Sequence, residues 1–203
     1  SAASDVYKRQ ALTICFEDRR GSEPESIIYH EPEGIVGFVK SINRNKDTVH
    51  EVIYVKGESD GITVEAAFQY VNEFHENVMG FCNNIFNAEG GTHLTGFKTI
   101  FTTVINSYAR QLNILKEKDA NFTGPDVRNG MTAVVSIKHP DPRFEGQTKT
   151  KLDNQDAAKV VSKVVGDEIT RYFDRNLETL KSIIGCAEKA AKIRKTEEKA
   201  KTN

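Results

Sequence analysis

The sequence contains no tryptophan, two methionines, five prolines and three cysteines among its 203 residues. Cys15, Cys82 and Cys186 are far apart and lack any CxxC spacing, which excludes a disulfide framework and argues against a zinc site. Long hydrophobic runs are also missing: the mean hydropathy is −0.50, whereas a membrane-spanning helix needs roughly 20 apolar residues in succession. Residues 1–10 have no apolar segment of the kind that a secretory signal requires. We therefore expect a soluble protein of a reducing compartment, the cytoplasm.

Neither sign of charge is in excess, since 28 basic residues stand against 29 acidic ones, a formal net charge of −1. This balance excludes a wholly basic nucleic-acid-binding domain but leaves a local basic patch open. Such a patch occurs over residues 187–203, which contain six basic and three acidic side chains. The length is enough for one domain, or one and a half, with a real buried core.

Both ends of the chain carry unusual patterns. The opening SAASDVYKRQ has neither an initiator methionine nor the pattern of a strand or helix, and we expect residues 1–10 to be a non-native, adaptor-like leader. The last residues, AEKAAKIRKTEEKAKTN, form a charged helical pattern with no glycine or proline stop signal. We expect the reading frame to end before the structure does; a frayed natural tail is the alternative.

Hydrophobic alternation of period two predicts strands in the first half of the chain. Residues 12–17 read as one arm of a hairpin whose partner is 26–30. Three further strands are expected at 51–56, 62–71 and 77–83, and Asp60–Gly61 is a favoured dipeptide for a tight turn. We expect these three to form an antiparallel sheet with one covered face.

Spacings of three and four predict the helices. A short helix fits 33–42, and the apolar residues from Leu94 to Leu115 form a stripe over about five turns. After a loop at 116–130, the apolar run 131–138 reads as a central strand. A polar loop at 139–151 precedes a helix from residue 157, and Asn176 is the expected N-cap of a third helix. The fold class is α+β, with helices packed on one face of a mixed sheet.

The segment EGGTH, residues 89–93, stands directly before the strongest helical pattern. Gly90 and Gly91 allow a sharp turn, and Thr92 is a suitable N-cap. A glycine turn that opens a helix can also hold phosphate, but a purely structural turn is the simpler interpretation. No second histidine stands at metal-ligand spacing from His93, so we expect no metal site.

The segment QTKTK, residues 147–151, lies in the polar loop between a strand and a helix. Lys149 could reach an anion, and the amide of Gln147 could donate to the same oxygens, which would suit a terminal phosphate. A solvated surface loop is the alternative. GxxxxGK[ST], GxGxxG, GxSxG and HExxH are absent.

Taken together, five segments resemble the B subunits of bacterial type IIA DNA topoisomerases, DNA gyrase first and topoisomerase IV as a close second. They occur in the family's order: YHEPEGIVGFVKSIN, SDGITVEAAFQY, NNIFNAEGGTHLTGFKT, MTAVVSIKHPDPRFEGQTKTKL and AAKIRK. EGGTH followed about fifty residues later by PDPxFxxQTKxxL is specific to this family. The resemblance covers residues 11–203.

The resemblance implies a domain organisation. Residues 11–31 resemble the C-terminal strands of a truncated GHKL-type ATPase domain. Residues 32–185 resemble the transducer domain, whose fold is similar to domain two of ribosomal protein S five and includes a left-handed βαβ crossover. Residues 186–203 resemble the start of a long C-terminal helix that links the transducer to a Toprim domain.

The resemblance also implies a function, that of an ATP-hydrolysing isomerase that passes one DNA duplex through another and changes supercoiling. Gln147 and Lys149 would reach the γ-phosphate of ATP, bound with Mg²⁺ in the neighbouring domain, and Lys149 would be the catalytic residue. Release of this contact would move the DNA gate. The implied partners are DNA, the A subunit of gyrase or topoisomerase IV, and a second copy of the B subunit. The isolated segment should be inactive.

Three further residues take their interpretation from the family. Lys98 stands where the family has a basic residue that faces the DNA cavity. Asp126 and Arg128 match turn residues, although Pro125 and Asn129 replace acidic ones.

Two alternatives remain. One is a non-enzymatic nucleic-acid or ribosome-associated module of the same fold, which would use the basic C-terminal helix. The other is a mismatch-repair or chaperone ATPase, families that lack the pairing of EGGTH with QTK.

Overall fold

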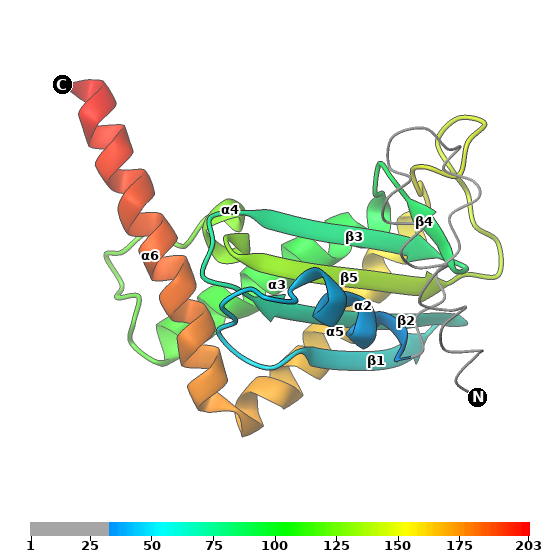
Figure 1. Ribbon diagram of the computed structural model, residues 1–203, viewed down its shortest axis with the longest axis horizontal. Helices are drawn as coiled ribbons and strands as arrows, with labels where there is room; N and C mark the ends of the chain where they lie inside the picture. Colours follow the sequence, from blue (N-terminus) through cyan, green and yellow to red (C-terminus); the bar gives the residue numbers. More distant parts are fainter. Residues whose placement is uncertain (1–32) are drawn as a thin grey trace.

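A computed structural model describes residues 33–203 of the chain (Figure 1). The expectations for residues 1–10 and 11–31, including the hairpin over 12–30, lie outside the described residues.

The described chain is an α+β domain, as the sequence predicts. Its helices are α2 (Gly34–Ile42), α3 (Thr92–Gln111), α4 (Gly124–Arg128), α5 (Gln155–Arg175) and α6 (Leu177–Thr202). Its strands are β1 (Ile53–Ser59), β2 (Ile62–Tyr70), β3 (Glu76–Cys82), β4 (Ile85–Asn87) and β5 (Met131–Lys138). The bounds agree with the predicted patterns to within a few residues, except that α4 and β4 were not predicted.

The five strands form one mixed sheet in the order β1-β2-β5-β3-β4. β5 is central, as predicted, and seven of its eight residues are buried. The expectation that the first three strands form one antiparallel sheet is wrong for β3. β5 lies between β2 and β3, antiparallel to the first and parallel to the second. A strand this apolar needs a neighbour on each edge and cover on both faces, which only the middle of the sheet provides.

Two tight turns define the hairpins. Asp60 and Gly61 have φ angles of 52° and 75° and join Ser59 to Ile62, which confirms the predicted turn. A second pair, Asn83 and Asn84, has φ angles of 52° and 67° and turns β3 into β4. Asparagine tolerates the left-handed conformation, so this dipeptide was a readable signal for the strand that the prediction missed.

Helices cover the sheet unequally. α3 and α5 lie behind it in Figure 1, where they pack on the inward side chains of β2 and β5 to form the main core. The short α2 lies on the opposite face, where Phe38 and Val39 cover Val134 and Phe81. The mixed sheet is confirmed, but the expectation that the helices share one face is wrong for α2. The cause is the central position of β5, because Val134 points away from α3 and α5 and needs its own cover.

α3 and α5 approach each other closely. A Cβ on Gly96 would lie 2.5 Å from the carbonyl oxygen of Ala158, so no larger residue fits this crossing. The contact seats Phe101 and Phe173 against Phe68, with ring centroids 5.0 to 6.5 Å apart. Such edge-on aromatic packing holds the two helices on the sheet.

α6 begins after Asn176, the predicted N-cap position, although the side chain of Asn176 makes no capping bond and donates instead to the carbonyl of Tyr172. Its buried side chains are Leu180, Ile183, Ile184, Ala187 and Ala191. The helix runs without a break through the expected boundary at 185/186. None of the described helices is both long enough and apolar enough to span a bilayer.

Candidate functional site

The two motifs predicted from the sequence lie against each other, at the end of the sheet where β5 leads into the 139–154 loop. Three backbone hydrogen bonds join them. The N–H of Glu89 donates to Thr150 at 2.8 Å, that of Leu152 to Gly90 at 3.0 Å and that of Thr92 to Leu152 at 3.0 Å. We call residues 87–93 and 149–152 the junction.

Gly91 makes this approach possible. Its φ of 141° is in the region that favours glycine, and a Cβ there would lie 2.4 Å from the carbonyl oxygen of Leu152. Gly90, with φ 72°, completes the turn. The expectation that Thr92 caps the helix is wrong, since Gly91 is the N-cap and the hydroxyl of Thr92 has no partner in the described part of the chain. The N-cap falls on Gly91 because its backbone pairs with that of Leu152.

Side chains from the first motif bind the second. The amide nitrogen of Asn87 donates to the carbonyl oxygen of Lys149 at 2.9 Å, and its oxygen lies 3.0 Å from Nε2 of His93. The hydroxyl of Thr150 donates to Glu89 at 2.6 Å and lies 2.9 Å from that of Thr148. The carbonyl of Lys149 and the next residue, Thr150, are therefore held from β4 and the turn that follows it.

His93 is fully buried, and burial lowers the pKa of its imidazole from 6.5 to about 4. The ring is therefore neutral at physiological pH. The described residues contain no cluster of acidic, histidine or cysteine side chains that could hold a metal ion, so His93 has a structural partner and no metal-ligand companions.

The QTK segment forms the tip of a turn closed at its base. The N–H of Glu145 donates to the carbonyl of Lys151 at 2.8 Å, and the two side chains form an ion pair at 2.8 Å. Gln147 and Lys149, within the turn, are exposed. In the described part of the chain no carboxylate pairs with the ammonium of Lys149. Among residues 33–203 the charge of Lys149 is thus free for an external anion, whereas the charge of Lys151 is engaged by Glu145.

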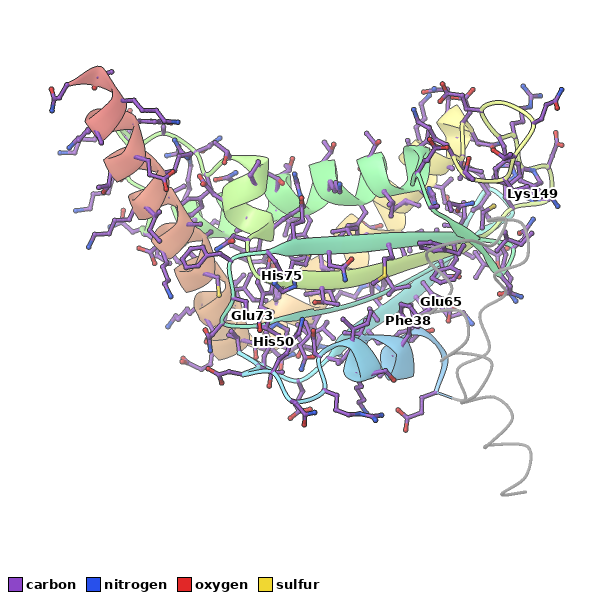
Figure 2. All side chains as sticks on the ribbon, turned by 45° about the horizontal axis from the view of Figure 1, so that its top comes forward. Phe38, His50, Glu65, Glu73, His75 and Lys149 are labelled. Atoms are coloured by element: carbon purple, nitrogen blue, oxygen red, sulfur yellow. The ribbon has the colours of Figure 1, made fainter. Side chains whose placement is uncertain are left out.

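Lys149 and α6 lie at opposite ends of the sheet. Figure 2 shows Lys149 at the opposite end of the sheet from His50 and His75, and Figure 1 shows α6 leaving from that other end. An ammonium with a nearby amide donor matches the oxygens of a phosphate group. The described residues of the site therefore offer donors suited to an anion, and no acid–base pair stands beside them.

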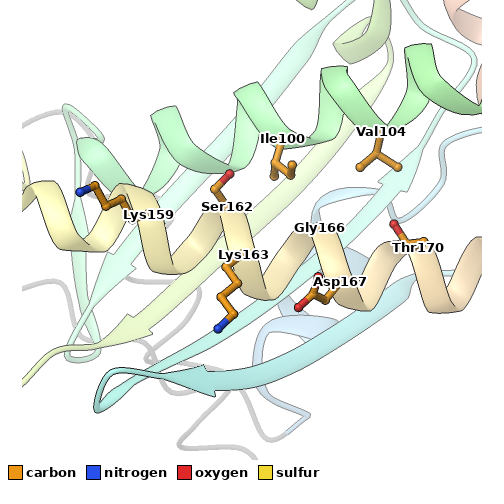
Figure 3. Close-up of a pocket in the computed structure, with 8 residues that line it drawn as sticks. All are labelled: Ile100, Val104, Lys159, Ser162, Lys163, Gly166, Asp167 and Thr170. Carbon is orange, nitrogen blue, oxygen red and sulfur yellow. The ribbon is translucent and has the colours of Figure 1, made fainter.

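Lys98 is not part of the junction. It is half-buried on α3, two turns from the start of the helix, and the structure brings no phosphate-binding partner to it from the described residues. A shallow groove between α3 and α5 has an apolar floor of Ile100 and Val104. Figure 3 shows Lys163 and Asp167 at its rim pointing away from α3, whereas the hydroxyl of Ser162 points towards that helix.

Sequence reasoning assigned no role to Asn87, and it did not predict the contact that Glu89 of the EGGTH segment makes with Thr150. Neither belongs to a spacing pattern, because their partners are 62 and 61 residues away along the chain.

Comparison with known proteins agrees with this architecture. The family model described as DNA gyrase B matches residues 34–203. The chain is 44% identical over 197 residues to the DNA gyrase B protein of Enterococcus faecalis, covering 97% of this chain and 31% of that protein. The identity is also 44% to the equivalent protein from Streptococcus pneumoniae serotype 4, of which 30% is covered. The chain therefore spans about a third of the length of these relatives.

Among solved structures, the 43K ATPase domain of Thermus thermophilus gyrase B in complex with an aminocoumarin matches with a TM-score of 0.78 and 30% identity. That match covers 86% of this chain and 47% of the other. The topoisomerase IV ATP-binding domain of Francisella tularensis matches with a TM-score of 0.69, 23% identity and coverage of 92% and 54%, which shows a shared fold.

Proposed function

The chain belongs to the DNA gyrase B family, and we propose that it senses the γ-phosphate of ATP and couples that contact to movement of the DNA gate in a type II topoisomerase. The sensing residues are Lys149, in the catalytic role, and Gln147. The observation that carries the proposal is the exposed ammonium of Lys149, unpaired among the described residues, on a turn whose backbone is fixed by the junction. A contact that exists with one nucleotide and not with another is what makes a switch.

The donors present fit one part of the nucleotide. The ammonium of Lys149 and the amide of Gln147 suit the terminal phosphate of ATP, whose charge grows during phosphoryl transfer. The described residues offer no carboxylate cluster for Mg²⁺. The chain's own contribution is therefore to orient and neutralise one phosphate, and the remaining contacts to ATP and Mg²⁺ belong to other parts of a B subunit. ATP would supply the free energy that drives strand passage.

The whole protein's organisation follows from the same proposal. Residues 32–185 would be the transducer domain, 11–31 would belong to the end of a GHKL-type ATPase domain, and 186–203 would lead towards a Toprim domain. The partners are DNA, the gyrase A subunit and a second copy of the B subunit, and the compartment is the cytoplasm. Lys98 faces the captured DNA.

The test is Lys149→Ala in the intact B subunit that carries this segment. Removal of one charge-stabilising donor should lower the ATPase kcat by about 100-fold. Lys149→Met, which keeps the length of the side chain, should do the same. Since Lys149 is exposed, the melting temperature should not change.

Lys56→Ala, on an exposed position of β1, is the control and should retain full activity. An ATPase rate for Lys149→Ala within twofold of the parent contradicts the proposal.

A non-enzymatic nucleic-acid module finds less support. Its basic helix would be α6, but Arg194 of that helix is engaged by Asp126 at 2.9 Å and by Glu198 at 3.2 Å. The free positive charge of this helix is therefore smaller than its sequence indicates.

A further inference from the structure

Asn87 is a buried side chain that connects the start of α3 to the lysine of the QTK turn. We propose that Asn87, oriented by neutral His93, is the positioning residue for Lys149, an inference that rests on the proposed phosphate-sensing function. The feature that carries it is a chain of two hydrogen bonds, from His93 to Asn87 at 3.0 Å and from Asn87 to the carbonyl oxygen of Lys149 at 2.9 Å.

The orientation of the Asn87 amide follows from its partners. A carbonyl oxygen only accepts, so the nitrogen of Asn87 must face Lys149 and its oxygen must face His93. Nε2 of His93 therefore carries the proton. This assignment leaves Nδ1 unprotonated, and Nδ1 is the ring nitrogen without a partner among the described residues.

The surroundings hold this arrangement in place. Asn87 is 2% exposed and His93 is fully buried, so water does not compete for their hydrogen bonds. A Cβ on Gly80 of β3 would lie 2.5 Å from Nε2 of His93, so the space for the imidazole depends on a glycine in the sheet. Burial also keeps the imidazole neutral, as a protonated ring would be costly here.

The hydrogen bond from Asn87 restrains Lys149, a residue that the backbone bonds of the junction do not reach. The backbone bonds hold Thr150 and Leu152 but stop short of the lysine. The bond from Asn87 restrains one residue more, because it binds the carbonyl of Lys149 itself. Fixing that peptide group fixes the direction in which the lysine side chain leaves the turn. A catalytic charge held in place before the reaction needs no reorganisation when charge develops.

The first readout is ATPase activity of the intact B subunit. Asn87→Ala should lower kcat about tenfold, with a change in KM for ATP of less than about threefold. His93→Leu removes the donor to Asn87 and should have a similar effect. His93→Gln restores a nitrogen donor near the position of Nε2 and should recover most of the loss. Asn87→Ala should cost nothing further in a Lys149→Ala background, because both changes remove the same contribution.

The matched control is Asn43→Ala. Asn43 is 4% exposed and also makes two side-chain hydrogen bonds, to Gln69 at 2.9 Å and from Thr132 at 3.0 Å. Its partners stand at the end of β2 and β5 that is remote from the QTK turn. The variant should lose stability as Asn87→Ala does, while its kcat stays within twofold of the parent.

The second readout is hydrogen exchange of the amides of residues 144–152 in the nucleotide-free protein, which does not depend on ATP turnover. Asn87→Ala and His93→Leu should exchange at least about fivefold faster there, and His93→Gln and Asn43→Ala should match the parent.

The outcomes separate the two ideas. If Lys149→Ala retains activity, the proposed function fails, whatever Asn87 does. If Lys149→Ala is inactive but Asn87→Ala behaves as Asn43→Ala in either readout, the positioning role is overturned and the proposed function stands. Equal effects of His93→Gln and His93→Leu overturn the part assigned to His93.

Discussion

Arg194, near the end of α6, binds Asp126 in α4, 68 residues earlier in the chain. Its Nε and Nη2 atoms lie 3.1 and 2.9 Å from the two carboxylate oxygens. Asp126 is 3% exposed and also forms a capping box with Thr123 at the start of α4. The bond joins the domain to the part of α6 that lies beyond its last buried residue, Ala191. It therefore restrains the direction in which α6 leaves the domain. Figure 1 shows the C-terminal part of α6 extending away from the sheet.

Removal of Arg194 should destabilise the protein. Arg194→Ala leaves the buried carboxylate of Asp126 with backbone and hydroxyl donors alone, and the free energy of unfolding should fall by about 1–2 kcal/mol. Urea denaturation measures the change. Lys195→Ala, at the exposed neighbouring position, is the control and should stay within about 0.5 kcal/mol of the parent. A loss for Arg194→Ala no larger than for Lys195→Ala contradicts the prediction.

Acid should destabilise the protein through His93. The pKa of its imidazole is about 4 in the folded protein and 6.5 when unfolded, so the unfolded chain binds more protons between these values. Stability from this group is complete above pH 6.5 and is lost as the pH falls towards 4. The slope from this one group is at most about 1.4 kcal/mol per pH unit. His93→Gln should remove it, while acid-labile groups elsewhere, such as Asp126, contribute equally to both proteins. Parallel stability curves for the parent and His93→Gln between pH 4 and 6.5 would show that His93 does not titrate in this way.

The junction should not tolerate a side chain at Gly91. A Cβ there meets the backbone of Leu152 at a φ that alanine rarely adopts, and Gly91→Ala should cost at least about 2 kcal/mol of unfolding free energy. Gly185→Ala is the opposite case. Gly185 lies within α6 with no atom near its added Cβ, and the substitution should stabilise by about 0.5–1 kcal/mol. Thermal unfolding of both variants tests the contrast, which fails if their shifts have the same sign.

The aromatic cluster should dominate core stability. Phe101 is fully buried, with its ring centroid 5.0 Å from that of Phe68. Phe101→Ala should lower the free energy of unfolding by about 3–5 kcal/mol through lost burial and the cavity left behind. Phe74, which is 63% exposed, has little to lose beyond its contact with Lys189, and Phe74→Ala should cost less than about 1 kcal/mol. Comparable losses for the two variants would refute this account of the core.

Local patterns were sufficient for most elements of the described fold. The helices α3, α5 and α6 were predicted because each has a long apolar pattern of helical period, and β5 because it is a continuous apolar run. β4, with three residues, and α4, with five, are too short to show a period. The pairing of β3 was predicted wrongly because pairing is decided between distant segments, and the alternation of β3 does not reveal which strand lies beside it.

The residues of the candidate site also fall into two groups, those that local sequence signals indicated and those that they did not. Gln147 and Lys149 were predicted as anion-binding residues from their polar loop and from the family resemblance. Gly90 and Gly91 were predicted as turn residues because two adjacent glycines before a helix mark a turn. Neither signal shows that the two segments touch. Asn87 had no signal at all, since an asparagine at the end of a short strand is unremarkable until its partner 62 residues away is known.

Composition and local pattern alone thus defined an α+β domain with a central apolar strand and two long amphipathic helices. They also defined two turns, one with the glycines of EGGTH and one with the lysines of QTKTK. The folded chain alone established that these turns bind each other, that Glu145 engages Lys151 but not Lys149, and that Arg194 meets a buried Asp126. The physical reason is that periodicity reports which face of an element is apolar, and burial follows from it. Hydrogen bonds and ion pairs depend on distances of about 3 Å between groups that only the folded chain brings together.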